Sequence, residues 1–230
     1  YARQDRRPRS TRVPISAKVV ANMLEAVGVE RLLTMDLHAD QIQGFFNIPV
    51  DNIYASPVLL SDLQSKRYTD LVVISPDVGG TKRAEEFRRA LEKALARPVA
   101  AGFMEKRRSW GVVSGEALFA EVGGRTAIII DDLISTGTTI LRAANAARER
   151  GARKVYAAAT HGLFVEGAAA VVADPAFARV VVADSVPPFR LTPDLVRARL
   201  DILDTAPLFA EAIRRICSRG SIVDLLGIEG

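Results

Sequence analysis

The fold of this chain is decided by the stretch Ala127-Ile128-Ile129-Ile130-Asp131-Asp132-Leu133-Ile134-Ser135-Thr136-Gly137-Thr138-Thr139-Ile140. It opens with an apolar, mostly β-branched run that is too short for a helix, and two acids follow this run directly. A loop of hydroxyl side chains around Gly137 comes next, and then an alanine-rich helical pattern from Leu141 to Arg150. This order predicts a strand, a loop and a helix.

The predicted loop suits a phosphate group, because backbone N–H groups of such a loop and of the helix N-terminus converge on one point. Hydroxyl groups add further donors at Ser135, Thr136, Thr138 and Thr139. Asp131 and Asp132 would repel a phosphate, so we expect them to accept hydrogen bonds from neutral diol hydroxyls nearby. A phosphate beside a diol describes a ribose 5-phosphate. The ordered string favours this interpretation over a plain acidic strand end before a capped helix.

A second strand, glycine loop and helix come earlier in the chain. Leu71 to Ser75 predicts a buried strand, Pro76 to Gly80 its loop, and Thr81 to Leu95 a charged amphipathic helix. Alternating strands and helices with short connections predict an α/β fold with a mostly parallel sheet flanked by helices. We also expect a hairpin in which Glu116 to Val122 and Thr126 to Ile130 flank a glycine turn.

Three strings resemble known families. The string from Asp131 to Thr139 resembles the phosphoribosyl-pyrophosphate-binding motif of the type I phosphoribosyltransferase fold. Two others are similar to ribose-phosphate pyrophosphokinases, and salvage phosphoribosyltransferases lack both: Tyr1-Ala2-Arg3-Gln4-Asp5-Arg6 and Asp36-Leu37-His38-Ala39-Asp40-Gln41-Ile42-Gln43-Gly44-Phe45-Phe46. The resemblance implies transfer of the diphosphate of ATP to the 1-hydroxyl of ribose 5-phosphate, giving phosphoribosyl pyrophosphate and AMP.

The same resemblance implies a role for each candidate site residue. Ribose 5-phosphate would be bound by Asp131, Asp132, Ser135, Thr136, Gly137, Thr138 and Thr139. The diphosphate loop would be formed by Asp77, Gly79 and Gly80. ATP would be bound by Arg3 and Gln4, and the catalytic residues would be Lys106 and Arg108. Mg²⁺ would be the cofactor, held at His38 and Asp77, although its preference for oxygen ligands leaves direct coordination by His38 open.

The resemblance also implies one complete type I phosphoribosyltransferase-like domain and part of a second. Residues 1–55 would be a remnant of the N-terminal domain, residues 56–205 the C-terminal domain, and residues 206–230 a C-terminal helix and tail. The N-terminal third of the family's chain has no counterpart before Tyr1. We therefore expect a truncated chain whose C-terminal domain binds ribose 5-phosphate and whose turnover of ATP is weak or missing.

Departures from the family pattern keep two alternatives open. The family most often has an aspartate at the place of Ser135, a glycine at Thr138, and a proline-bearing segment at Ser109 and Trp110. The alternatives are a salvage phosphoribosyltransferase and a non-catalytic regulatory homologue that binds phosphoribosyl ligands.

Bulk properties limit the remaining classes of function. The net charge of +4 is a small excess, and the basic clusters lack the interleaved aromatic residues typical of nucleic-acid binding. No apolar run is long enough for a membrane span, so we expect a cytoplasmic protein, and the resemblance adds a homo-oligomer, either a hexamer or a dimer. Cys217 is the single cysteine and is expected in the core, His161 is expected to be structural, and Lys106 to Gly115 is expected to form a mobile loop.

Overall fold

The computed structural model of the chain describes every residue except 1–2, 8–11, 67, 110–111 and 227–230, and leaves the side chains of residues 106–109, 112–116 and 226 undescribed. The chain divides into two compact units. One contains Tyr1–Ala55 together with Ala206–Gly230, and the other contains Ser56–Thr205.

The second unit is built on a seven-stranded sheet in the order β5-β4-β3-β6-β7-β8-β9. Its strands are β3 (Leu71–Ser75), β4 (Ala100–Ser109), β5 (Val112–Phe119), β6 (Thr126–Ile134), β7 (Lys154–Gly162), β8 (Arg179–Ala183) and β9 (Leu200–Leu203). All neighbours are parallel except β4 and β5, which are antiparallel. The expected fold class is therefore confirmed. The expected hairpin between β5 and β6 is wrong, because β5 pairs with β4 and β6 pairs with β3 and β7.

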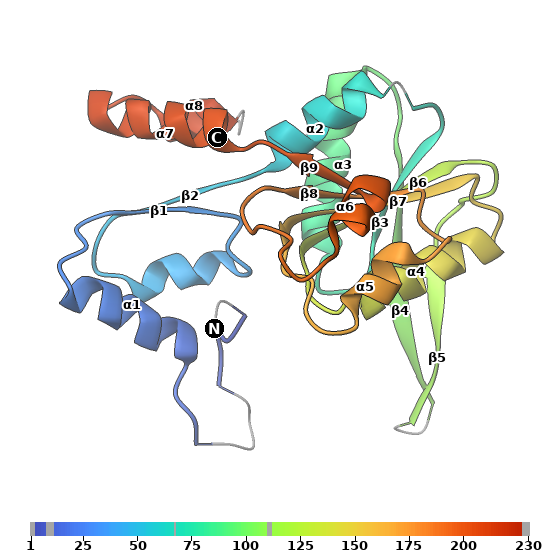
Figure 1. The fold of residues 1–230 in the computed structure, drawn as a ribbon, viewed down its shortest axis with the longest axis horizontal. Helices are drawn as coiled ribbons and strands as arrows, with labels where there is room; N and C mark the ends of the chain where they lie inside the picture. Colours follow the sequence, from blue (N-terminus) through green and yellow to red (C-terminus); the bar gives the residue numbers. More distant parts are fainter. Residues whose placement is uncertain (1–2, 8–11, 67, 110–111, 227–230) are drawn as a thin grey trace. The chain divides into compact units, whose positions relative to one another are not determined.

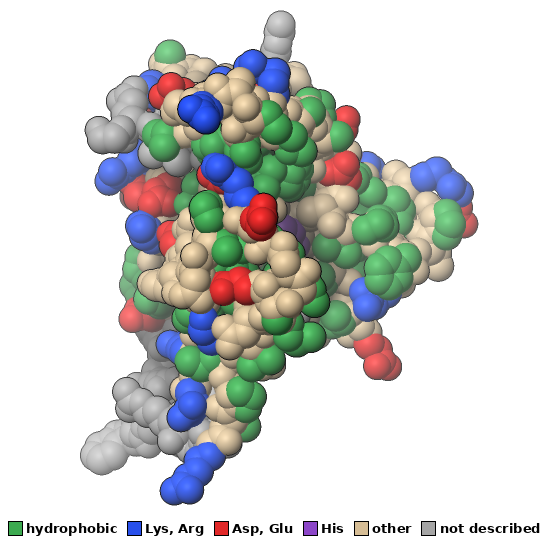
Figure 2. Space-filling view, turned by 90° about the vertical axis from the view of Figure 1, so that its left-hand side faces the viewer, with side chains coloured by type: hydrophobic (Ala, Val, Ile, Leu, Met, Phe, Trp, Pro, Cys, Tyr) green, Lys and Arg blue, Asp and Glu red, His purple; other side chains and the backbone are tan. Residues whose placement is uncertain are grey.

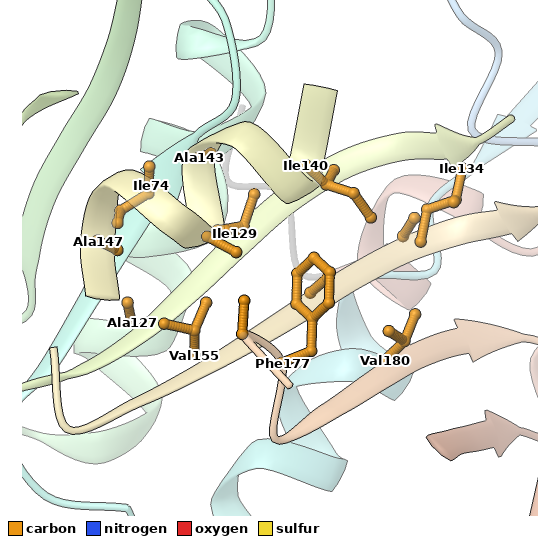
Figure 3. Close-up of a cluster of buried hydrophobic side chains, with 14 of the residues drawn as sticks. Ile74, Ala127, Ile129, Ile134, Ile140, Ala143, Ala147, Val155, Phe177 and Val180 are labelled. Atoms are coloured by element: carbon orange, nitrogen blue, oxygen red, sulfur yellow. The ribbon is translucent and has the colours of Figure 1, made fainter. Parts of the chain in front are cut away.

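Helices cover both faces of this sheet (Figure 1). They are α2 (Ser56–Ser65), α3 (Thr81–Leu95), α4 (Thr138–Glu149), α5 (Ala168–Ala173) and α6 (Pro193–Arg199). Alternation along β6 explains the two layers, since Ala127 and Ile129 pack with α4, whereas Ile128 and Ile130 pack in the cluster that contains α2 and α3. Figure 3 shows small side chains of α4, Ala143 and Ala147, facing the sheet, which lets the helix approach it closely.

The strand order places the connections of β3 and β6 on opposite sides of one point. The chain leaves β3 through α3 for β4, whereas it leaves β6 through α4 for β7, and β3 and β6 are direct neighbours. Open α/β sheets bind ligands outside the carboxyl ends of the strands at such a reversal. The loops that follow β3 and β6 are the two glycine-bearing loops that the sequence singles out.

The first unit holds a two-stranded parallel sheet and four helical segments. Its elements are α1 (Ser16–Ala26), β1 (Leu32–Met35), the 3-10 helix η1 (Asp40–Phe45), β2 (Val50–Ile53), α7 (Ala206–Ser218) and α8 (Ile222–Leu226). Ala212 of α7 is buried with Met35 and Ile53 of the two strands. Strand β2 was not expected, because Ile48 to Val50 reads as an irregular apolar stretch.

Two further expectations in the first unit are wrong. After Pro14 the sequence predicts Ser16 as the N-cap of a helix, but the residue before α1 is Ile15. The backbone carbonyl of Gln4 accepts a hydrogen bond from Ala17 N at 3.2 Å. An N–H group at the helix start is thus satisfied by the preceding segment instead of by a serine cap. Cys217 is exposed, not part of the core, because the buried position of α7 is Ala212.

The surface mixes charges of both signs. On the face shown in Figure 2, blue Lys and Arg side chains alternate with red Asp and Glu side chains and with apolar ones. Within the described part of the chain, no helix has the length and apolar character needed to cross a membrane.

Candidate active site

Asp131 and Asp132 lie inside strand β6, not after its end. Pairing with β7 continues through Leu133 and Ile134, because the neighbouring strand offers backbone partners as far as Gly162. Only 3% of the Asp132 side chain is exposed, against 22% for Asp131. Asp132 N donates a hydrogen bond to Asp131 Oδ1 at 2.9 Å. The two carboxylates therefore form a close, largely buried acidic pair, on the part of β6 that runs past the carboxyl end of β3.

A cation from another element faces this pair. Arg83 Nη1 of α3 lies 3.4 Å from Asp131 Oδ1 and 3.4 Å from Asp132 Oδ1. The sequence interpretation did not single out Arg83, although a signal was available. Lys82 and Arg83 occupy the first turn of α3, where the helix dipole disfavours cations, and α3 has no acidic residue there. Cations in that unfavourable place indicate a local negative partner.

Asp131 holds its proton more tightly than an isolated aspartate does. Burial raises the pKa of Asp131 to about 7, and the hydrogen bond and negative charge of Asp132 act in the same direction. Arg83 opposes this rise because its charge favours the ionised carboxylate. Asp131 consequently gives up its proton near neutral pH.

The hydroxyl loop after β6 turns sharply at Gly137. This residue has φ of +80°, and a Cβ atom there would lie 2.7 Å from Val171 Cγ1 of α5, so only glycine fits without strain. Thr136 Oγ1 lies 3.1 Å from Thr138 Oγ1 and accepts a long 3.4 Å hydrogen bond from Thr138 N. Helix α4 begins at Thr138, with no side-chain hydrogen bond from Gly137 as its cap. The start of α4 thus presents backbone N–H groups and hydroxyls together.

The loop after β3 is held by Asp77. Gly80 N donates to Asp77 Oδ1 at 2.9 Å, and Ser75 Oγ donates to the Asp77 carbonyl at 2.6 Å. A Cβ atom on Gly80 would lie 2.8 Å from Ser75 Oγ, which explains the glycine. Asp77 itself is exposed. The loop therefore presents backbone and one carboxylate at the carboxyl end of β3.

His161 lies at the carboxyl end of β7 and contacts a neighbouring hydroxyl. His161 Nδ1 lies 2.8 Å from Ser185 Oγ, and this hydroxyl also donates to the Thr160 carbonyl at 3.1 Å. The sequence interpretation treats His161 as a satisfied structural histidine, and its contact with Ser185 agrees with that interpretation.

Lys106 and Arg108 lie on β4, where the sequence predicts a mobile loop. The backbone instead continues as a strand to Ser109 and pairs with β5, with a register shift between Arg107 and Arg108. The expected loop is thus a β-hairpin, because Val112, Val113 and the residues after them supply a pairing strand. The side chains of Lys106 and Arg108, and the whole of Trp110, lie outside what the structure describes.

The remaining candidate residues belong to the first unit. His38 follows β1 and is half-buried. Its turn is fixed by Leu37 N donating to Asn52 Oδ1 at 3.2 Å and by Ala55 N donating to Asp36 Oδ2 at 2.8 Å. Arg3 and Gln4 are exposed ahead of α1, with Gln4 tied to it through its backbone carbonyl.

A metal site requires several donor side chains close together. Among the described residues, no group of three or more His, Cys, Asp and Glu side chains gathers around one point. Asp77 nevertheless fits Mg²⁺, which commonly takes one or two protein carboxylates and completes its shell with phosphate oxygens and water. The Asp77 carboxylate is exposed at the glycine loop after β3, so it is available as such a donor.

Comparisons with known proteins agree over almost the whole chain. A family model described as "N-terminal domain of ribose phosphate pyrophosphokinase" matches residues 1–28, and one described as "Phosphoribosyl synthetase-associated domain" matches residues 112–227. The chain is 54% identical over 227 residues to the ribose-phosphate pyrophosphokinase of Ralstonia nicotianae, covering 98% of this chain and 69% of that protein. The corresponding protein of Burkholderia pseudomallei is 51% identical over 226 residues, with the same coverage.

A solved structure agrees as well. The crystal structure of phosphoribosylpyrophosphate synthetase from Mycobacterium smegmatis superposes with a TM-score of 0.83 at 38% identity, covering 96% of this chain and 69% of that one. Sequence and fold therefore point to the same group of proteins.

Proposed function

The chain belongs to the ribose-phosphate pyrophosphokinase family, and from this premise we propose that the loops after β3 and β6 form its site for ribose 5-phosphate and diphosphate. The family's reaction joins the 1-hydroxyl of ribose 5-phosphate to the β-phosphorus of ATP. The bond between the α- and β-phosphates breaks, and AMP leaves. The difficulty of this step is negative charge, so positioning and neutralisation supply most of the catalysis.

The β6 loop would bind ribose 5-phosphate. The acidic pair accepts hydrogen bonds from the two ring hydroxyls, while the start of α4 donates to the 5-phosphate. Its donors are the backbone N–H groups around Gly137 and the hydroxyls of Ser135, Thr136, Thr138 and Thr139. The observation that carries this proposal is the placement of the buried acidic pair and the hydroxyl-bearing start of α4 beyond the carboxyl ends of the neighbouring strands β3 and β6.

The β3 loop would hold the diphosphate. Glycine at positions 79 and 80 lets the backbone approach the phosphate oxygens, and Asp77 would hold Mg²⁺. A metal role for His38 rests on the resemblance of its own string alone. When bound, Mg²⁺ supplies positive charge to the diphosphate. Asp77 has a second task, because its hydrogen bond from Gly80 N shapes the loop that receives the ligand.

Three further assignments rest on the resemblance of the strings alone. Lys106 and Arg108 would neutralise the charge that moves to AMP as it leaves. Arg3 and Gln4 would contact ATP, with the Arg3 guanidinium either paired with a phosphate or stacked on adenine. A homo-oligomer is part of the same proposal, and sedimentation velocity tests it.

The test of the reaction is AMP formation. The chain is incubated with ATP, ribose 5-phosphate and Mg²⁺, and AMP and phosphoribosyl pyrophosphate are quantified by chromatography. AMP that appears only when both substrates are present supports the diphosphokinase. Binding of both substrates without any AMP would instead support a non-catalytic homologue, the alternative that the residues at Ser135, Thr138 and Ser109 keep open.

A further inference from the structure

Among the described residues of the site, Arg83 is a cation that contacts both acids but has no role in the proposed reaction. It lies on the first turn of α3, directly after the diphosphate loop, and Nη1 is 3.4 Å from one oxygen of each acid. At this distance both contacts are long compared with charge-assisted hydrogen bonds of about 2.7–2.9 Å. The guanidinium therefore lies between the two carboxylates and makes no close bidentate hydrogen bonds to either.

The same nitrogen reaches toward the diphosphate loop. A Cβ atom placed on Gly80 would lie 4.0 Å from Arg83 Nη1. The guanidinium accordingly lies between the backbone of the β3 loop and the acids of β6, which are the two ends of the proposed ligand. About a third of its side chain is exposed, at 32%, so it has room to turn.

Binding of ribose 5-phosphate would change how the negative charge of Asp131 and Asp132 is stabilised. Without sugar, two close carboxylates require a cation, and burial makes their repulsion costly. When the diol donates its hydroxyl hydrogens to the acids, the need for Arg83 falls. A diphosphate at the β3 loop offers phosphate oxygens to the same guanidinium, which suits their geometry.

We propose, on the basis of the proposed function, that Arg83 is exchanged between the two parts of the site. It neutralises Asp131 and Asp132 while the sugar site is free, and it binds the diphosphate once the ribose diol has taken its place. Arg83 thereby couples occupation of the ribose subsite to affinity for the diphosphate group.

Calorimetry on the full chain tests this coupling with two probes that differ only in the diphosphate. Ribose 5-phosphate and phosphoribosyl pyrophosphate are titrated, with Mg²⁺, into the wild type, Arg83→Gln and Arg83→Lys. The Arg83→Gln variant should lose about ten- to one-hundred-fold affinity for phosphoribosyl pyrophosphate. Its affinity for ribose 5-phosphate should stay within about threefold or rise, because a competitor for the acids is gone. Arg83→Lys should fall between, since a lysine keeps the charge but not the planar fork.

A matched control is Arg89→Gln on the same helix, where the arginine pairs with Glu85 at 2.7 Å and is exposed. This variant should bind both probes as the wild type does. An equal loss of both affinities in Arg83→Gln, with Arg83→Lys behaving alike, would show a structural role and overturn the exchange. Unchanged affinities would overturn it too. Failure of the wild type to bind either probe would overturn the proposed function itself, and with it this inference.

Discussion

Gly80 N donates a hydrogen bond to Asp77 Oδ1 at 2.9 Å. One oxygen of Asp77 thus shapes the loop, while under the proposed function the carboxylate charge would serve Mg²⁺. In Asp77→Asn the amide oxygen can still accept from Gly80 N, but the charge is lost. We expect the Mg²⁺ concentration for half-maximal diphosphate transfer to rise about tenfold or more, with little change in the melting temperature. An unchanged Mg²⁺ dependence would remove Asp77 from the metal site.

Two features of position 137 disfavour any side chain there. In Gly137→Ala the methyl group would press on Val171 Cγ1, at 2.7 Å, and the backbone would keep φ of +80°. We expect a loss of about 2–4 kcal/mol in the free energy of unfolding, from steric overlap and left-handed strain together.

The double variant Gly137→Ala, Val171→Ala separates the two causes. It removes the overlap and leaves the strain, so urea unfolding should show less than additive destabilisation. Fully additive losses would contradict the contact between Gly137 and α5.

The pKa of Asp131 makes stability depend on pH. Its pKa in the folded protein is about 7, whereas the ordinary aspartate value is 3.8. Between these values the folded state binds more protons than the unfolded state, so the free energy of unfolding should fall as pH rises from about 4 to 7 and then level off. Asp131→Asn should lack this decline. The difference in melting temperature, Asp131→Asn minus wild type, should be greater at pH 8 than at pH 4 by about 2–4 °C or more.

The control for this titration is Glu86→Gln, which removes an exposed acid from α3. Parallel melting curves of wild type and Asp131→Asn across this pH range would show that Asp131 is an ordinary acid. An acid pair after an apolar run would be expected to face solvent, but Asp132 is buried.

Lys106 is proposed to act on the reacting phosphates and not on the sugar. Lys106→Ala should therefore lower turnover by about one hundred- to one thousand-fold, the range for losing a group that stabilises developing charge. Calorimetry should show an affinity for ribose 5-phosphate within about twofold of the wild type. A large loss of sugar affinity would place Lys106 elsewhere in the site.

Local patterns predicted the elements that are stabilised within their own segments. Leu71–Ser75 and Thr81–Leu95 have the predicted bounds. The strand is a short buried run, and the helix carries Ala84, Phe87 and Leu91 on one face, so the spacing of apolar residues is enough to predict both. The type I fold and the family followed from ordered strings that no single element could supply.

Elements decided by distant partners were predicted less well. β6 is longer than expected because β7 pairs with it through Ile134, and β5 pairs with β4 although a glycine turn joins it to β6. α6 and β9 were missed. A cap signal existed for α6, since Thr192 Oγ1 accepts from Leu195 N ahead of Pro193. Arg83 was missed because its contacts cross from α3 to β6.

The central claim is that Asp131 and Asp132 recognise the diol of ribose 5-phosphate. The measurement that tests it most directly is calorimetric titration of ribose 5-phosphate against 2-deoxyribose 5-phosphate, which lacks one diol hydroxyl. The wild type should bind the ribose compound about tenfold more tightly or better, because a carboxylate loses a charge-assisted hydrogen bond with the deoxy compound. In Asp131→Asn, Asp132→Asn this preference should shrink toward equality. Equal affinities of the wild type for the two sugars would contradict the account.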